Sequence, residues 1–199
     1  MRPPSELDAV LRETKPDVVI DFSGADATAA NAPVILRHAD IVVGTTGFTP
    51  EQKAALEAAV RASGRGAVIS PNMSIEMNVL FDIVAQVARM VPNADVAIHE
   101  EHHTRKKDAP SGSAKKLAEC VGRDVQISSA RLGNVVGKHT VSFVLANERL
   151  DFTHEAYSRE AFADGALKAA EFVRGKKGVY SMADVIAGAR QPPPSEKRN

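Results

Sequence analysis

Residues 17–24 read Asp-Val-Val-Ile-Asp-Phe-Ser-Gly, and this stretch decides the fold. Residues 17–22 form an apolar run of the kind that predicts a strand buried on both faces. The Ser-Gly pair that follows predicts a turn. Two further apolar runs come next, Ile-Val-Val at residues 41–43 and Ala-Val-Ile-Ser at residues 67–70. This part of the chain therefore contains three candidate buried strands.

Helical segments separate these strands. Asp26 is expected to cap a first helix that extends to about residue 38. Thr49, Pro50 and Gln52 predict the start of a second helix, because threonine caps a helix, proline suits its first position and glutamine its third. Strands and helices that alternate at this spacing predict a parallel sheet covered on both faces.

A different pattern begins after residue 73. A long helix is expected at 74–90, because apolar residues recur there every four positions. The segments that follow are a strand at 95–102, a helix at 111–121, strands at 125–132, 138–146 and 149–157, and helices from Ser158 and Ser181. Alternation of polar and apolar residues in the last strands predicts a mixed sheet with one face in water or in a subunit interface. The sequence thus predicts an α/β portion followed by an α+β portion.

The composition is that of an ordinary globular protein of 199 residues, with 25 basic and 25 acidic residues. This balance favours neither a nucleic acid nor an anionic membrane as a partner. Cys120 is the single cysteine, which excludes an internal disulfide and fits a reducing compartment. No apolar run approaches the roughly 20 residues of a membrane span, and the first residues do not resemble a secretory signal. We expect a cytoplasmic protein with a disordered tail at residues 191–199.

Residues 99–114, HEEHHTRKKDAPSGSA, concentrate groups that exchange protons or bind anions. Residues 99–103 formally match H-E-x-x-H, the zinc-protease motif. That motif requires a helix, whereas Val96 and Ile98 predict a strand, on which adjacent side chains point to opposite faces. No third ligand is evident, so we expect no metal site. A measurement of bound zinc would test the hypothesis of a zinc hydrolase.

Two other interpretations of these histidines remain. They could be polar residues at a strand end that bond one another or water. Alternatively, one is a general acid, because imidazole titrates near neutral pH and Arg105 or Lys106 could tune it. Residues 108–113 open a helix, where free amides and the hydroxyls of Ser111 and Ser113 would suit a carboxylate. An acid histidine, a lysine and a carboxylate site suggest reduction of an acidic, unsaturated substrate.

The three predicted parallel strands end in small and hydroxyl-bearing residues. Ligands of open parallel sheets bind beyond the carboxyl ends of the strands. These ends are residues 21–24, 44–47 and 70–73. Either a nucleotide binds across them, or they are ordinary turns between strand and helix.

Residues 101–114 closely resemble the signature of the dihydrodipicolinate reductase family, the 4-hydroxy-tetrahydrodipicolinate reductases of the diaminopimelate route to lysine. The resemblance extends along nearly the whole chain, through VVIDFSG, VVGTTGF, SPNMSIEMNVL, RLGNVVGKHTV, ERLDFTHEAYSREAFADGAL and GVYSMADVI. It implies a Rossmann-like parallel sheet and an α+β domain for substrate binding and oligomerisation.

The resemblance also implies roles for individual residues. His102 matches the family's proton donor, and Lys106 its second catalytic cation. The matching substrate-binding positions are His103, Gly112, Ser113 and Arg159. The matching dinucleotide contacts are Phe22, Gly44, Thr45, Thr46, Ser70, Pro71, Asn72 and Met73. The last four depart from the commoner Ala-Ala/Pro-Asn-Phe spelling, so packing near the nicotinamide is expected to differ.

The family's chemistry implies NADPH or NADH as cofactor, a cyclic dicarboxylate as substrate and assembly into a homotetramer. It also implies the domain organisation. Residues 1–73, completed by 160–190, would form the dinucleotide-binding domain, and residues 74–159 the substrate-binding and tetramerisation domain.

Family members begin with a strand and a glycine-rich G-x-x-G-x-x-G turn that holds the pyrophosphate, whereas this sequence starts after both. The resemblance therefore implies a partial Rossmann-like sheet that lacks the N-terminal βαβ unit. One hypothesis is an NAD(P)H-dependent reductase with a truncated or misassigned start. The other is a non-catalytic module that binds a dicarboxylate and assembles but cannot retain the dinucleotide. The choice between NADH and NADPH stays open.

Overall fold

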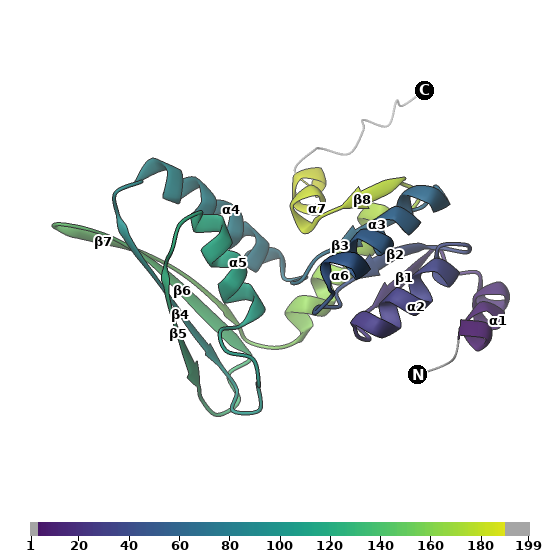
Figure 1. Cartoon of the computed structure of the whole chain (residues 1–199), viewed down its shortest axis with the longest axis horizontal. Helices are drawn as coiled ribbons and strands as arrows, with labels where there is room; N and C mark the ends of the chain where they lie inside the picture. The colour runs from purple at the N-terminus through teal and green to yellow at the C-terminus, as the bar shows by residue number, and fades with distance from the viewer. Residues whose placement is uncertain (1–3, 190–199) are drawn as a thin grey trace, which may run out of the picture. The chain divides into compact units, whose positions relative to one another are not determined.

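The computed structural model describes residues 4–189, so the predicted disordered tail at 191–199 lies outside the described residues. The chain divides into two compact units. Within the described residues, the first unit comprises 4–73 and 164–189, and the second comprises 74–163. Each unit has its own four-stranded sheet (Figure 1).

The first unit is built on a parallel sheet in the order β1-β2-β3-β8, with β1 at one edge. Its elements are α1 (Pro4–Thr14), β1 (Val18–Asp21), α2 (Ala25–Ile35), β2 (Asp40–Val43), α3 (Pro50–Ser63), β3 (Gly66–Ile69), α6 (Glu160–Val173) from residue 164 on, β8 (Gly178–Tyr180) and α7 (Met182–Ala189). Strand β2 is buried along its whole length. The parallel α/β architecture predicted from the apolar runs is confirmed, whereas β8 was not predicted.

The two predicted helix starts in this unit have different outcomes. The cap of α3 is confirmed, because Thr49 Oγ1 accepts a hydrogen bond from the Gln52 amide at 3.2 Å and Gln52 Oε1 accepts one from the Thr49 amide at 3.0 Å. The predicted cap of α2 by Asp26 is wrong, because the N-cap is Gly24, with no side-chain bond. The Asp26 carboxylate instead accepts a bond from Gln52 Nε2 at 2.8 Å.

Asp40 joins three segments of the first unit. Its side chain is buried, and its two oxygens accept hydrogen bonds from the amides of Gly66, at 2.9 Å, and Gly175, at 2.8 Å. The carboxylate thus ties β2 to the first residue of β3 and to the turn after α6. A buried carboxylate with two amide donors is expected to stabilise this unit.

Replacing Asp40 with alanine is expected to lower the free energy of unfolding by about 1–3 kcal/mol, because the buried Gly66 amide and the partly buried Gly175 amide both lose their acceptor. Urea denaturation followed by circular dichroism would measure the loss. Asp17→Ala is the matched control, because Asp17 is exposed and close in sequence to β1. Equal midpoints for the two variants would contradict this role of Asp40.

The second unit is a mixed sheet in the order β5-β4-β6-β7, with β4 and β5 parallel and the other pairs antiparallel. Its elements are α4 (Ile75–Met90), β4 (Asp95–His102), α5 (Gly112–Val121), β5 (Gln126–Arg131), β6 (Gly137–Leu145) and β7 (Glu148–Ala156). Its core includes Met77 and Val84 of α4, Leu117 of α5 and Ile98 of β4. The predicted mixed sheet is confirmed.

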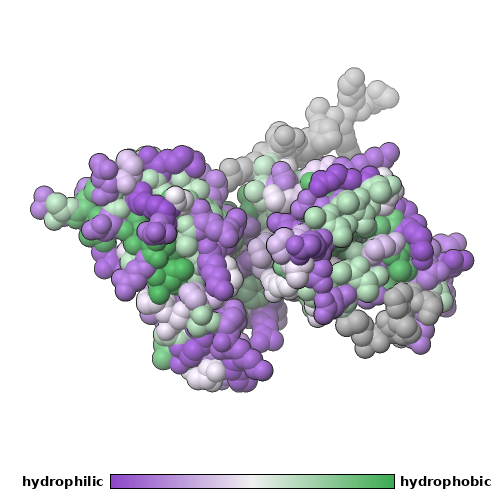
Figure 2. Space-filling view, viewed as in Figure 1, coloured by the Kyte–Doolittle hydropathy of each residue, from purple (hydrophilic) through white to green (hydrophobic). Residues whose placement is uncertain are grey.

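No helix among residues 4–189 is long and apolar enough to cross a membrane. On the described surface drawn in Figure 2, hydrophilic residues predominate and smaller hydrophobic areas lie among them.

Candidate active site

Along strand β4, successive side chains of the histidine-rich segment point to opposite faces of the sheet. Ile98, Glu100 and His102 are buried, whereas His99 is exposed and its Nδ1 lies 2.8 Å from Ser128 Oγ. His103 follows the end of the strand. Because residues 95–102 form a strand, His99 and His103 do not share a helix face, and the formal zinc-protease motif is not realised.

Glu100 is the fully buried centre of a polar cluster. Arg131 Nη2 donates to Glu100 Oε1 at 2.9 Å, and Arg131 Nη1 donates to Oε2 at 3.2 Å. The Ser111 amide donates to Oε1 at 3.3 Å, and His102 Nδ1 bonds Oε2. A carboxylate held by this many donors has little freedom to rotate.

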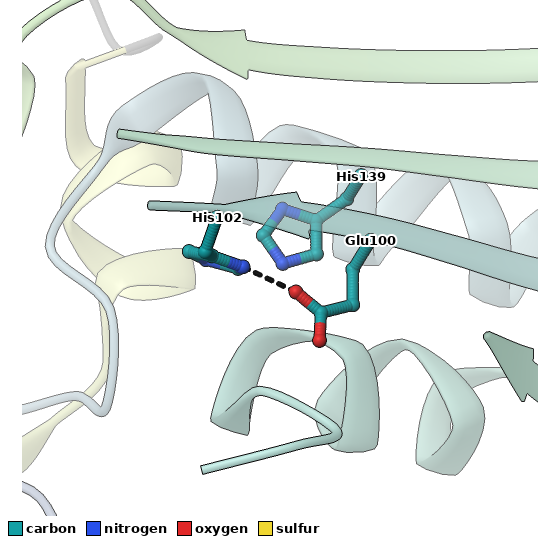
Figure 3. Close-up of side chains that lie close together, drawn as sticks. All are labelled: Glu100, His102 and His139. Carbon is teal, nitrogen blue, oxygen red and sulfur yellow. Dashed lines mark hydrogen bonds and ion pairs between the residues drawn. The ribbon is translucent and has the colours of Figure 1, made fainter. Parts of the chain in front are cut away.

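Sheet register brings this cluster together. In the antiparallel pairing of β4 and β6, Glu100 lies opposite His139, and in the parallel pairing of β4 and β5, His102 lies opposite Arg131. The rings of His102 and His139 meet edge to face, with centroids 5.1 Å apart. Figure 3 shows the two imidazoles beside the Glu100 carboxylate, with the bond from His102 drawn as a dashed line.

The far side of the His102 ring lies against Gly137, the first residue of β6. A Cβ placed on Gly137 would come within 3.0 Å of His102 Nε2. A side chain at this position would therefore meet the nitrogen that Glu100 does not bind. Glycine is needed at residue 137 for close approach, whereas its backbone conformation is ordinary.

The electrostatics of the cluster follow from burial and pairing. Burial raises the pKa of Glu100, but hydrogen bonds from Arg131, Ser129 and His102 outweigh it and lower the pKa to about 2. Burial lowers the pKa of His102, against the opposing effect of Glu100. Burial, assisted by His102, lowers the pKa of His139 to about 3. Near neutral pH, Glu100 is therefore ionised and His139 uncharged.

The loop after β4 carries the other predicted residues. Lys106 Nζ lies 2.8 Å from Asp108 Oδ1, with the carboxylate on the solvent side of the pair. Burial lowers the pKa of His103, and Arg105 and Arg159 act in the same direction. Arg159 is exposed and electrostatically coupled to His103, so the structure brings this distant residue to the same region.

The start of α5 differs in one respect from the prediction. Gly112 is the exposed first residue of the helix, and Ser113 is half-buried. Ser111 is buried as the N-cap, where its Oγ accepts a bond from the Ala114 amide at 3.2 Å and lies 3.0 Å from His139 Nε2. The hydroxyl of Ser111 therefore serves the fold and the histidine cluster, and its predicted part in an open anion site is wrong.

The carboxyl ends of β1, β2 and β3 lie at one edge of the first sheet. Asp21 pairs with Val43 and Val43 with Ile69, so the residues that follow these three are neighbours in register. They are Phe22, Gly44 and Ser70. The Phe22 ring is 52% exposed and covers Gly44, where a Cβ would come within 2.2 Å of the ring.

The remaining predicted dinucleotide contacts belong to the same edge. Thr45 is buried, and its Oγ1 accepts a hydrogen bond from Thr28 Oγ1 at 3.0 Å, whereas Thr46 is exposed. The Ser70 hydroxyl donates to the Asn72 carbonyl at 2.8 Å and so shapes the turn of residues 70–73. Pro71 is exposed and Met73 is buried in this turn. Binding of a dinucleotide by these residues stays a prediction.

Three members of the cluster were not identified from the sequence, namely Glu100, Arg131 and His139. One signal was present: Glu100 alternates with Ile98 and His102, so a buried strand face would carry an acid between an apolar residue and a histidine. A buried carboxylate requires a cation or several donors. The identity of the partners depends on pairing with β5 and β6, which the local sequence does not specify.

One metal-binding geometry is present among the described residues. Ligand atoms of Glu100, His102 and His139 all lie within 4.8 Å of one another. Both oxygens of Glu100 are already bound by Arg131, whose positive charge opposes a cation at the same place. The cluster is therefore better suited to proton chemistry than to a metal.

The fold and this site define a two-unit α/β protein. One unit has a parallel sheet with the carboxyl ends of its strands at one edge, and the other has a mixed sheet that contains a buried carboxylate–histidine cluster. Residues 3–73 match the family model "Dihydrodipicolinate reductase, N-terminus", and residues 76–186 match "Dihydrodipicolinate reductase, C-terminus". The chain belongs to the dihydrodipicolinate reductase family.

Individual relatives agree with this assignment. The 4-hydroxy-tetrahydrodipicolinate reductase of Methanosarcina barkeri is 41% identical over 201 residues, which cover 90% of this chain and 76% of the relative. The 4-hydroxy-tetrahydrodipicolinate reductase of Anaeromyxobacter sp. is 45% identical over 197 residues, which cover 85% of this chain and 73% of the relative. The structure of a dipicolinate-bound dihydrodipicolinate reductase from Paenisporosarcina sp. TG-14 has a TM-score of 0.76 at 24% identity, covering 88% of this chain and 75% of that one, which shows the shared fold.

Proposed function

We propose that this chain reduces 4-hydroxy-tetrahydrodipicolinate to tetrahydrodipicolinate with NADPH or NADH, in the diaminopimelate route to lysine. The observation that carries the proposal is the His102–Glu100 pair at the end of β4, followed at once by Lys106 and the N-terminus of α5. One short segment thus offers an acid, a cation and backbone amides. The relatives named as this reductase support the same activity.

In this mechanism His102 supplies a proton while the substrate accepts a hydride and loses its 4-hydroxyl group as water. A bound nicotinamide would supply the hydride. Lys106 and the amides of Gly112 and Ser113 would hold one carboxylate, since a helix N-terminus and an ammonium both favour an anion. His103 and Arg159 would provide further contacts to the substrate, as resemblance to the family implies.

The proposed cofactor contacts are the strand ends of the first unit, as resemblance to the family implies. Thr46 is exposed at this edge, and the exposed ring of Phe22 provides a flat apolar surface beside Gly44. Open parallel sheets bind nucleotides at such edges. The first unit would thus serve the dinucleotide and the second unit the substrate.

We also propose that the second unit assembles this chain into a homotetramer through its sheet. Helices α4 and α5 supply the apolar core on one face of the sheet, and β7 forms one edge. Exposed apolar side chains on β6 and β7 include Val144, Leu145 and Leu150. Such side chains on an edge hairpin suit a subunit interface. Light scattering after gel filtration would measure the assembly.

Titration of the 199-residue chain with NADH and with NADPH tests the function directly. We expect saturable binding of at least one nucleotide, tighter in the presence of pyridine-2,6-dicarboxylate, and turnover of the substrate. Calorimetry would measure binding, and loss of nucleotide absorbance would measure turnover. Binding of the pyridine dicarboxylate without any binding of nucleotide would instead support the non-catalytic module.

A further inference from the structure

We propose that Glu100 is a positioning residue that holds His102 as the Nδ1–H tautomer, directs Nε2 to the substrate, and links this ring to the start of α5. The inference rests on the proposed function, because it assigns the atom of His102 that delivers the proton. It assigns Glu100 no contact with the substrate.

The first step concerns the proton between Glu100 and His102. A carboxylate that is ionised near neutral pH can only accept a hydrogen bond. Because Glu100 is buried and paired with Arg131, its ionised form dominates. The proton in the bond to His102 must therefore reside on Nδ1. The neutral ring then has an unprotonated Nε2, and the charged ring has a proton on Nε2 that it can donate.

The second step concerns the direction of Nε2. The ring is held at Nδ1 by Glu100 and on one edge by His139, so it has little freedom to turn. Nε2 faces Gly137, the one neighbour in this cluster without a side chain. A side chain at residue 137 would occupy the space beside Nε2, so glycine at this position keeps that space open. Glu100 thus binds Nδ1 of the His102 ring, and Gly137 leaves room beside Nε2.

The third step links the acid to the proposed carboxylate site. Glu100 Oε1 accepts a bond from the Ser111 amide, and Ser111 is the N-cap of α5. Ser111 Oγ also contacts His139 Nε2, so two side chains of the cluster touch the same cap. Arg131 Nη2 donates to the Asp108 carbonyl and thereby holds the loop before α5 at a second point. The buried Glu100 carboxylate therefore fixes the orientation of the His102 ring and the position of the helix start that carries the amides of residues 112 and 113.

The charged groups around His102 predict how the pH dependence responds. Glu100 favours the protonated ring, whereas Lys106 and Arg131 disfavour it, and His139 adds no charge near neutral pH. Removing the negative charge of Glu100 leaves the two cations unopposed. The pKa of His102 should then fall, and less of the ring would be protonated at a given pH.

A direct test is the tautomer of His102 in the intact chain. Nitrogen-15 NMR of the histidine-labelled protein, titrated from pH 5 to pH 9, distinguishes protonated from unprotonated ring nitrogens. His102→Gln assigns the signals. We expect the neutral ring to carry its proton on Nδ1. A neutral ring protonated on Nε2 would overturn the proposal, and this result does not depend on whether the chain turns over substrate.

A second test uses Glu100→Gln with Glu101→Gln as its matched control. Glu101 is adjacent, loses the same charge and lies on the opposite face of β4, where it pairs with His99 and Lys138. For Glu100→Gln we expect kcat to fall on the order of 10-fold to 100-fold, with a smaller change in KM. As pH rises, the variant should lose activity at a lower pH than the parent does, because the pKa of its His102 is lower.

Wild-type kcat and an unshifted pH profile in Glu100→Gln would overturn the proposal. So would equal losses in Glu101→Gln, since they would show a general effect of charge. If Glu100→Gln does not fold, the tautomer measurement on the parent chain still tests whether Glu100 holds the proton of His102 on Nδ1. If the parent chain shows no turnover, the proposed function fails, whereas the tautomer experiment judges the placement of the proton separately.

Discussion

Replacing His102 with glutamine is expected to lower kcat by about 10²-fold to 10⁴-fold, the range that a positioned general acid contributes. Glutamine keeps a polar group of similar reach near Glu100 but cannot deliver a proton. The free energy of unfolding should change little, because Glu100 keeps its bonds to Arg131 and Ser111. Reductase assays with nicotinamide nucleotide and thermal unfolding would measure the two effects.

His99→Gln is the matched control for this loss of activity. His99 lies three residues earlier on β4, is exposed and contacts only the hydroxyl of Ser128 and the Glu101 carboxylate in the described contacts. Its replacement should leave kcat within about 2-fold, as for a surface substitution away from the site. Near-normal turnover in His102→Gln would contradict the proton-donor role, even if binding of nucleotide were intact.

Replacing Gly165 with alanine is expected to cost the largest amount of stability, about 3 kcal/mol or more. Gly165 lies on α6 in the first unit, and a Cβ there would be 1.8 Å from the Met73 carbonyl oxygen. A side chain could turn aside, but this obstacle is backbone at the end of the turn of residues 70–73. Either the helix or the turn must shift, with loss of packing around both.

Chemical denaturation of Gly165→Ala would measure this cost. Gly112→Ala is the control for stability, because no atom lies within 4 Å of a Cβ placed there and the position is the first of a helix. Its unfolding midpoint should equal or slightly exceed that of the parent chain. A midpoint for Gly165→Ala close to that of Gly112→Ala would show that α6 can move away from Met73 at little cost.

Local sequence was sufficient for most of the fold. The apolar runs at 17–22, 41–43 and 67–70 predicted three strands of a parallel sheet. The predicted full burial is wrong for β1, because this strand lies at the edge of the sheet and its Ile20 side chain is exposed. The Thr49–Gln52 capping box was predictable because its hydrogen bonds form within one turn. Asp26 and β8 show the limit. Asp26 bonds Gln52 instead of capping α2, and β8 has only three residues, stabilised as a strand by pairing with β3.

The sequence by itself also determined the residues of the proposed site that are close together along the chain. Those at 102–113 belong to one segment, and strand ends that follow parallel strands share an edge for geometric reasons. Only the tertiary structure shows that Nδ1 of His102 is the bound nitrogen and that Glu100 is its partner. Glu100, Arg131 and His139 come from three strands, and only hydrogen bonding between those strands sets the register that aligns them. Because that register depends on contacts between distant segments, no local pattern specifies it.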